Sequence, residues 1–244
     1  MDIVIPSDIL DDLSSRFIIN VPDEERHDLI RLFFQIELAH WFYIDFYYNC
    51  PNEAELPSCT LREFAKQLFQ HIPFLCGYLD QFQTVFEQWK MYKITVPTYG
   101  AILMDVSLEK VVLVQSYSTS SWGFPKGKVN ADEEAHVCAI REVFEETGFD
   151  ISELIDENEF FENCINNQVI RLYIITRVPS DTQFQTTTRK EIKKIDWFSI
   201  SDLPQHKNDA TPKTYLGMTP NKFFSVMAFV RPLRQWIQSQ QMKN

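Results

Sequence analysis

The pattern of apolar and polar residues changes near residue 94. Up to that point apolar side chains recur every three to four residues, the period of a helix with one buried face. Beyond Val96-Pro97, short apolar runs rich in β-branched residues take over, as in strands. Such runs cover residues 99–104, 110–115 and 168–178, and a further strand is expected around residues 195–198.

Start and stop signals place four helices in the first part of the chain. Thr60, with Glu63 three residues later, forms a capping box, and the helix that it opens should end before Pro73. The other three are expected to start at a Ser7 cap, at Pro22-Asp23 with a continuous run through LIRLFFQIELAHWFYIDFYY, and at residue 80 with an end at residue 94. A last helix, opened by Pro220, should run through Trp236.

Two domains are the simplest division of this pattern. We expect an all-α domain over residues 1–94, a hinge over residues 95–98 and a strand-containing domain over residues 99–244, which makes the chain α+β. Its 244 residues exceed the usual single core.

Composition indicates a globular protein, since 45% of the residues are hydrophobic and 14% aromatic. There is no run of 18 apolar residues and the N-terminus is acidic, so we expect neither a membrane span nor a signal peptide, and an intracellular protein. An odd number of cysteines without a CxxC pair favours reduced thiols over disulfides or a zinc site. The five are Cys50, Cys59, Cys76, Cys138 and Cys164.

Charge is distributed unevenly along a chain whose net charge is −11. Residues 1–94 hold 15 acids and 7 bases, whereas residues 163–244 hold 5 acids and 12 bases, a net charge of +7. A basic C-terminal region beside an acidic site suits a phosphate chain as ligand. The alternative is ordinary solubilising charge.

An acidic stretch, GKVNADEEAHVCAIREVFEETGF, covers residues 127–149. On a helix from about Asp132 onward, with Asp132 as N-cap and Gly148 as the left-handed stop, three glutamates share one face. They are Glu142, Glu145 and Glu146, and the opposite face carries Val137, Ile140, Val143 and Phe144. Arg141 can orient Glu145, and Cys138 is expected to be a small packed thiol.

Three carboxylates at this spacing repel one another unless a cation neutralises them. Because neither His nor paired Cys lies nearby, an oxygen-preferring ion such as Mg²⁺ or Mn²⁺ is favoured over zinc. The alternative is a solvated acidic face without function.

The full pattern of this stretch resembles the Nudix box, GX5EX7REUXEEXGU, in which U is apolar. Gly127, Glu133, Arg141-Glu142, Glu145-Glu146 and Gly148-Phe149 all match it. The resemblance implies a loop and helix that bind divalent metal and hydrolyse a diphosphate attached to a nucleoside.

Motifs outside the box resemble one branch of that superfamily, the catalytic subunits of mRNA-decapping enzymes. They are QIELAHWFYIDF, VPTYGAI, WGFPKGK, TRKEIKKIDWF and NKFFSVMAFVRPLRQW, at residues 35–46, 96–102, 122–128, 188–198 and 221–236. The resemblance implies a helical regulatory domain, then a Nudix α/β/α sandwich with a mixed sheet and a basic C-terminal helix that binds RNA. It further implies a metal-dependent hydrolase that cleaves the 5′ cap into 7-methyl-GDP and 5′-monophosphate RNA, initiating mRNA decay.

Roles for single residues follow from the same resemblance. It implies Glu142, Glu145, Glu146 and the backbone carbonyl of Lys126 as metal ligands, with Glu133 structural or secondary. It also makes Glu191 the general base, so that Glu191 and Glu146 are the catalytic residues. The residues expected to contact RNA are Lys128, Arg171, Lys190, Lys213, Lys222, Phe224, Arg231 and Arg234.

Cap recognition calls for an aromatic face and a carboxylate, because 7-methylguanine is a cationic ring with N–H groups at its edge. Trp41 and Asp45 lie four residues apart, hence on one helix face, and match the family's cap-binding pair. The alternative for Trp41 is a place in the core. If the pair binds the cap, the two domains must close on each other, with the Pro97 region as hinge.

The expected partners are capped mRNA, decapping enhancers and a smaller regulatory decapping subunit that docks on the helical domain. The expected location is the cytoplasm, in mRNA-decay granules or P-bodies, with the nucleus as a second compartment. Two features depart from the family: the loop QSYSTSS before Trp122 lacks its glycines and lysine, and QWIQSQQMKN is less basic than expected. The family's long tail is also absent, so the chain is expected to be the catalytic core.

Two other functions stay open. One is a Nudix enzyme for free small substrates, such as nucleoside diphosphate sugars or dinucleoside polyphosphates. The other is a non-catalytic RNA-binding or scaffold protein, against which the intact acidic triad counts.

Overall fold

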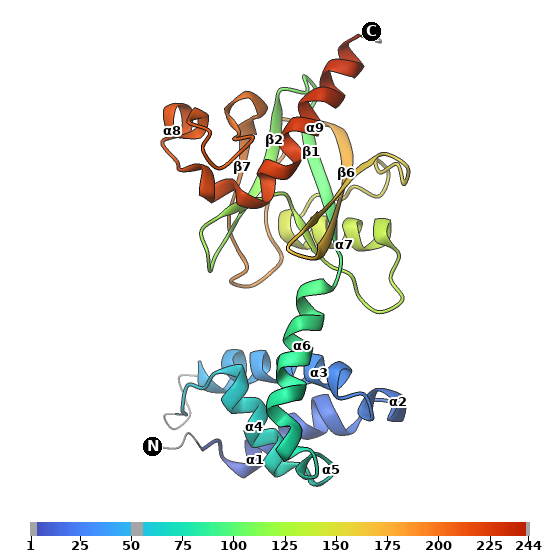
Figure 1. Ribbon diagram of the computed structural model, residues 1–244, viewed down its shortest axis with the longest axis vertical. Helices are drawn as coiled ribbons and strands as arrows, with labels where there is room; N and C mark the ends of the chain where they lie inside the picture. Colours follow the sequence, from blue (N-terminus) through green and yellow to red (C-terminus); the bar gives the residue numbers. More distant parts are fainter. Residues whose placement is uncertain (1–3, 50–55, 243–244) are drawn as a thin grey trace. The chain divides into compact units, whose positions relative to one another are not determined.

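Helical periodicity in the first part of the chain gives a unit whose described regular elements are all helical (Figure 1). The computed structural model of the protein describes residues 4–49 and 56–242, and it divides into one unit that ends at Ile94 and a second that begins at Thr95. Among the described residues, no helix is both long and apolar enough to cross a bilayer.

The helices of the first unit follow one another closely. They are α1 (Ser7–Ser14), continued by a π-helical turn at Ser15–Ile19, α2 (Asp23–Arg26), α3 (Leu29–Phe42), continued by a π-helical segment at Tyr43–Tyr48, α4 (Leu61–His71), α5 (Pro73–Cys76), a 3₁₀ turn at Leu79–Gln81 and α6 (Phe82–Thr95). The capping box predicted at Thr60 and Glu63 is confirmed, and α4 ends before Pro73 as expected.

Two of the expected helix starts are wrong. Ser7 is the first helical residue of α1 and makes no capping hydrogen bond. The continuous helix expected from Pro22-Asp23 is interrupted, because the Asp28 carboxylate accepts hydrogen bonds from the backbone N–H groups of Ile30 and Arg31 and so starts α3 anew. A local side-chain bond thus overrides the helical period.

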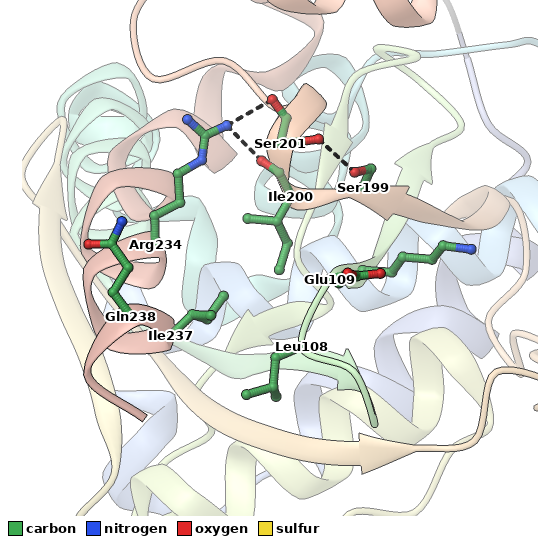
Figure 2. A pocket seen from close by; sticks show the side chains of 9 residues that line it. Leu108, Glu109, Ser199, Ile200, Ser201, Arg234, Ile237 and Gln238 are labelled. Atoms are coloured by element: carbon green, nitrogen blue, oxygen red, sulfur yellow. Dashed lines mark hydrogen bonds between the residues drawn. The ribbon is translucent and has the colours of Figure 1, made fainter. Parts of the chain in front are cut away.

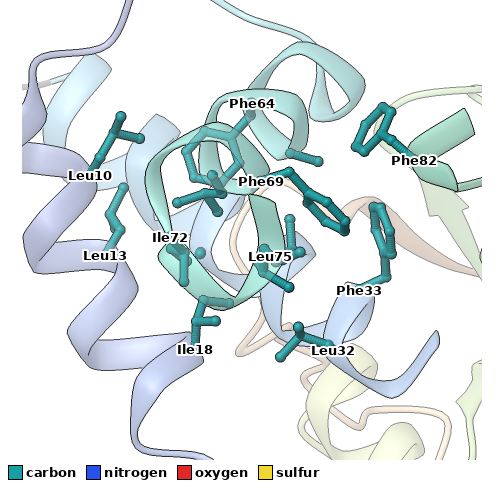
Figure 3. Close-up of a cluster of buried hydrophobic side chains, with 14 of the residues drawn as sticks. Leu10, Leu13, Ile18, Leu32, Phe33, Phe64, Phe69, Ile72, Leu75 and Phe82 are labelled. Carbon is teal, nitrogen blue, oxygen red and sulfur yellow. The ribbon is translucent and has the colours of Figure 1, made fainter. Parts of the chain in front are cut away.

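The core of the first unit is built around Phe33 on α3 (Figure 3). This side chain is fully buried, and its ring centroid lies 5.5 Å from that of Phe69, 6.0 Å from Phe82 and 5.7 Å from Trp89. Aromatic rings at these separations gain packing energy beyond that of burial alone. Phe33 therefore ties α4 and α6 to α3.

We expect Phe33→Ala to destabilise the first unit by about 3–5 kcal/mol, because the change leaves a cavity among rings that cannot collapse into it. Urea unfolding followed by tryptophan fluorescence, with Trp89 beside the cavity, measures the loss. Phe46→Ala is the control, since that ring is 59% exposed and its removal should cost about 0.5 kcal/mol or less. Equal losses for the two variants would contradict the packing described here.

The second unit contains a mixed sheet. Its strands are β1 (Thr98–Asp105), β2 (Lys110–Ser116), β3 (Trp122–Gly123), β4 (Lys126–Lys128), β5 (Phe160–Ile165), β6 (Gln168–Val178) and β7 (Ile192–Ser199). The order β3-β2-β1-β6-β5 runs through the sheet, β4 also pairs with β1, and β7 with β2. Strands β1 and β6 are parallel, and the other pairs are antiparallel.

Helices cover both faces of this sheet. Along β1, Ala101 and Leu103 pack in the cluster that includes Val143 of α7 (Ala135–Thr147). The alternate residues Ile102 and Met104 pack in the cluster formed with α9 (Phe224–Gln241). This alternation confirms the expected α/β/α sandwich. A short helix α8 (Thr211–Leu216) and 3₁₀ turns at Ile200–Asp202 and Pro220–Phe223 complete the unit.

The start of the second unit is held by hydrogen bonds from other parts of that unit. The carbonyl of Val96 accepts a hydrogen bond from the Gln168 side chain at 2.9 Å, and the carbonyl of Pro97 accepts one from the N–H of Val129 at 3.1 Å. Thr98 then enters β1. The hinge expected over residues 95–98 stays a prediction, and its first residue, Thr95, is the last residue of α6.

Candidate active site

The acidic helix α7 begins later than expected. Its first residue is Ala135, with Glu134 at the N-cap position, so Asp132 is not the cap; it lies in the preceding turn with a φ of 57°. The end of the helix is as predicted: Gly148 has a φ of 71°, and its N–H donates to the carbonyl of Phe144.

Only part of the expected apolar face of α7 is buried. Val143 is fully buried and Ile140 packs at the edge of the same cluster, but Val137 and Phe144 are 45% and 47% exposed. The buried positions are filled instead by the small residues Cys138 and Ala139, which let the helix approach β1 closely.

The three glutamates of the helix differ in burial. The Glu146 side chain is buried, that of Glu142 is nearly so, and that of Glu145 is 41% exposed. Arg141 donates to Glu142 at 2.6 Å and lies 3.5 Å from Glu145. It thus orients Glu145, as expected, and holds Glu142 as well.

Glu133 is the main partner of Arg141. Its two carboxylate oxygens accept from Nε and Nη2 of Arg141 at 2.7 and 2.8 Å, and one of them also accepts from the N–H of Asn130. Arg141 Nη2 also donates to the carbonyl of Lys128. These charge-assisted bonds hold the pKa of Glu133 below its usual value. Glu133 therefore fastens the preceding loop to α7, which agrees with a structural role.

Strand β4 brings the backbone against the buried glutamates. The N–H of Lys126 donates to Glu146 at 2.9 Å. A Cβ on Gly127 would lie 1.9 Å from the Glu142 carboxylate, so any larger residue there would displace that carboxylate. On β1, a Cβ on Gly100 would lie 2.0 Å from the carbonyl oxygen of Pro125, and this glycine lets β4 pair with β1. A glycine inside the strand pattern YGAI was the available sequence signal for that close approach.

Burial raises the pKa of Glu146 to about 8, against the opposing effect of the Lys126 N–H. Burial also raises the pKa of Glu142, although Arg141 opposes the shift. The negative charge of Glu191, in the loop before β7, also raises the pKa of both. Arg141 is the cation that Glu133, Glu142 and Glu145 share.

The donor set fits an oxygen-preferring divalent cation, since carboxylate oxygens are the ligands that Mg²⁺ and Mn²⁺ prefer. Within residues 4–49 and 56–242, no three His, Cys, Asp or Glu side chains stand in an arrangement ready to hold a metal ion, and Arg141 is bonded to Glu142 and Glu145. The ligand roles of Glu142, Glu145, Glu146 and the Lys126 carbonyl stay predictions.

Cys138 is a packed thiol, as expected. It is fully buried and donates weakly to the carbonyl of Gly127 at 3.8 Å, and burial raises its pKa to about 12, which makes it unreactive. Cys59 is also buried, whereas Cys76 and Cys164 are exposed, and all four are free thiols. Cys50 lies outside the described residues.

Trp41 lies at the surface of the first unit, not in its core. The side chain is 58% exposed on the last turn of α3, and Asp45 follows in the π-helical segment. Phe46 and Leu38 are 59% and 46% exposed. An exposed indole suits stacking on a flat cationic ligand. The cap-binding role of Trp41 and Asp45 stays a prediction.

Two of the arginines expected to contact RNA have internal partners. Arg171 donates to Glu162 at 2.8 Å, and its guanidinium lies 4.0 Å from the ring centroid of Phe160. Arg234, on α9, donates to the backbone carbonyls of Ile200 and Ser201 (Figure 2) and also to that of Leu203. It lines a cavity of about 470 Å³ whose lining includes no residue of α7. The other expected RNA contacts are Lys128, which is partly buried, and Lys190, Lys213, Lys222, Phe224 and Arg231, which are exposed.

Two family models match the chain: the Dcp2 box A domain over residues 8–92 and the NUDIX domain over residues 95–216. The mRNA decapping complex subunit 2 of Schizosaccharomyces pombe is 47% identical over 239 residues, which cover 98% of this chain and 31% of that protein. The m7GpppN-mRNA hydrolase dcap-2 of Caenorhabditis elegans is 45% identical, with 98% and 30% covered. The mRNA-decapping enzyme subunit 2 of Arabidopsis thaliana is 40% identical, with 94% and 60% covered. The chain thus spans about a third of the first two relatives.

Proposed function

The chain belongs to the Nudix family, with a Dcp2 box A domain ahead of its Nudix domain, and we propose that it is an mRNA-decapping enzyme. It hydrolyses the 5′ cap of RNA to release 7-methyl-GDP and RNA with a 5′-monophosphate, and so begins mRNA decay. One observation carries this proposal. The same chain has a box A domain with an exposed Trp41 and a Nudix domain whose helix α7 bears three glutamates.

Hydrolysis of the cap requires a water molecule to attack a phosphorus atom that anionic oxygens shield. Glu191, in the loop before β7, accepts the proton of that water. Glu142, Glu145 and Glu146 would hold Mg²⁺ or Mn²⁺, which when bound neutralises charge on the phosphate oxygens and activates water. Arg141 supports Glu142 and Glu145 from the side.

Substrate selection falls to other parts of the chain. Trp41 stacks on the 7-methylguanine and Asp45 accepts its edge N–H groups. Lys213, Lys222 and Arg231 bind the phosphates of the RNA body, and the exposed Phe224 stacks on a base. Arg171 and Arg234 contribute less, because their guanidinium groups already bind protein partners.

We also propose partners and a place of action. The names of the relatives from S. pombe and A. thaliana describe subunits, so a smaller regulatory subunit docked on the helical domain is the first partner to seek. Decapping enhancers are further partners. The proposed location is the cytoplasm, including P-bodies, with the nucleus as a second compartment.

The test is release of labelled 7-methyl-GDP from a cap-labelled RNA of some tens of nucleotides, with Mg²⁺ or Mn²⁺, with and without the partner subunit. Release from capped RNA but not from a free cap dinucleotide supports decapping. Hydrolysis of a dinucleoside polyphosphate or a nucleoside diphosphate sugar, without release from capped RNA, would replace it with a small-molecule Nudix activity. RNA binding without metal-dependent turnover of any of these would indicate a scaffold protein.

Trp41→Ala should weaken use of the cap by about 5–150-fold in kcat/KM, since stacking on a base is worth about 1–3 kcal/mol. The measurement is decapping at subsaturating RNA. Trp41→Phe keeps an aromatic face and should lose less, whereas Met91→Ala, at a residue 62% exposed in the same unit, should lose nothing. Equal rates for Trp41→Ala and the wild type would remove Trp41 from the cap site.

A further inference from the structure

The segment before Glu191 caps the C-terminal end of α7. The last carbonyls of a helix have no partners within it. Here the N–H of Gln185 donates to the carbonyl of Thr147, and the N–H of Thr187 donates to the carbonyl of Glu145, both at 2.9 Å. A Cβ on Gly148 would lie 2.6 Å from the carbonyl oxygen of Gln185, so the segment lies directly against the helix end.

Two threonine hydroxyls add to this contact. Thr186 Oγ1 donates to the carbonyl of Glu145 at 3.2 Å, and Thr187 Oγ1 donates to the same carbonyl at 3.0 Å. With the N–H of Thr187, three donors therefore meet one oxygen that has two lone pairs. The Glu145 carbonyl thus receives more donors than it needs to be satisfied. The two hydroxyls therefore add contacts between the segment and α7 beyond those that this carbonyl requires.

Thr186 also shapes the chain that follows. Its Oγ1 accepts a hydrogen bond from the N–H of Thr188 at 3.1 Å and lies 2.7 Å from Thr188 Oγ1. This local turn ends three residues before Glu191. Upstream, the ring of Phe184 contacts those of Phe149 and Trp197, at centroid distances of 6.1 and 5.9 Å.

Glu191 is therefore held from two sides. On one side its segment is bonded to Glu145 through the threonines, and on the other the carbonyl of Glu191 accepts from the N–H of Tyr117 at 2.8 Å. Between these two contacts, Lys190 has a backbone φ of 56°. A residue with a Cβ rarely adopts this angle unless neighbouring contacts hold it there.

We propose that Thr186 and Thr187 are positioning residues that set the distance from the Glu191 carboxylate to the glutamates of α7. This inference rests on the proposed function, in which Glu191 is the general base. A base must lie within hydrogen-bond reach of its proton. The threonines bind the backbone carbonyl of Glu145, and the side chain of Glu145 belongs to the glutamates of α7. The same hydrogen bonds therefore fix the segment of the base relative to these glutamates.

The test compares two double variants of the whole chain. Thr186→Val with Thr187→Val keeps the side-chain shape and removes both hydroxyls, and we expect kcat to fall about 10–100-fold with KM unchanged, as for a base displaced by up to about 1 Å. Thr186→Ser with Thr187→Ser keeps both hydroxyls and should retain the rate within about threefold. A valine pair as active as the wild type would overturn the proposal.

Combination with Glu191→Gln separates positioning from general loosening of the site. If the hydroxyls act through Glu191, the valine pair should cost nothing further once that carboxylate has gone. A further loss equal to that in the wild-type background would place the effect elsewhere on α7 and contradict the proposal.

Hydrogen exchange distinguishes failure of this inference from failure of the proposed function, because it needs no substrate. The amides of residues 185–191 should exchange faster in the valine pair and at the wild-type rate in the serine pair. Unchanged exchange in the valine pair would overturn the inference whatever the substrate is. Faster exchange in a protein that does not decap RNA would leave the anchor in place and refute the decapping function alone.

Discussion

Glu146→Gln is expected to lower the decapping rate by about 10³-fold or more. Glu146 is the most buried of the three helix glutamates, and its carboxylate is held by the N–H of Lys126. The amide keeps a similar shape but removes a negative charge from the set proposed to hold the metal, and metal stabilisation of phosphate charge is worth several kcal/mol, at about 1.4 kcal/mol for each tenfold change in rate. Single-turnover cleavage of cap-labelled RNA measures the loss.

Binding of Mn²⁺ to the same variant, followed by calorimetry without RNA, tests the cause. We expect Mn²⁺ affinity to fall together with the rate. Glu153→Gln makes the same change of charge at an exposed position of the second unit and should alter neither quantity. A slow Glu146→Gln enzyme with wild-type Mn²⁺ affinity would show that Glu146 is not a metal ligand.

Glu191→Gln is expected to reduce kcat by about 10²–10⁴-fold, the usual contribution of a general base. Glutamine cannot accept the proton of the attacking water, yet it keeps the length of the side chain and the backbone bond to Tyr117. The decisive comparison is with Glu146→Gln, because Mn²⁺ affinity should remain within about threefold of the wild type when only the base has gone.

The pH profile gives a second check on this variant. Loss of the base should flatten the rise of kcat with pH that the wild type shows on the acidic side. If Glu191→Gln keeps that rise and most of the rate, another group accepts the proton and the assignment of Glu191 is wrong.

Local signals in the sequence predicted the elements whose causes are local. The capping box of Thr60 and Glu63, the left-handed stop at Gly148 and the shared face of Glu142 and Glu145 all depend on residues within one or two helical turns. The break before α3 was missed although its cause is also local, because the apolar period continues through Asp28 while the side chain caps the next helix.

The strands that were missed have no pattern of their own. Strands β3 and β4 contain two and three residues, too few for an alternation to appear, and they form because β2 and β1 offer partners. Strand β5, FFENCI, pairs only with β6 among the described strands and has three exposed residues in succession. Such edge strands are defined by their neighbours rather than by their own composition.

The sequence likewise predicted only the local part of the site. The spacing of Glu142, Glu145 and Glu146 predicts that they share a helix face. No sequence pattern predicts which residues from distant segments bond to them. The bond from the N–H of Lys126 to Glu146 joins segments 20 residues apart, and those from Thr186 and Thr187 to Glu145 span 41 and 42 residues. No periodicity reports such pairs.

The thiols described above give each unit a chemical handle of its own. Cys76 is exposed in the first unit and Cys164 in the second, whereas Cys59 and Cys138 are buried and have pKa values raised to about 11 and about 12. A maleimide dye reacts with the thiolate of an accessible cysteine, so in a Cys50→Ser background a mixture of donor and acceptor dyes would label one site in each unit, and part of the molecules would carry one dye of each kind. Energy transfer between them would report on how the units move as capped RNA binds, without adding a cysteine to the chain.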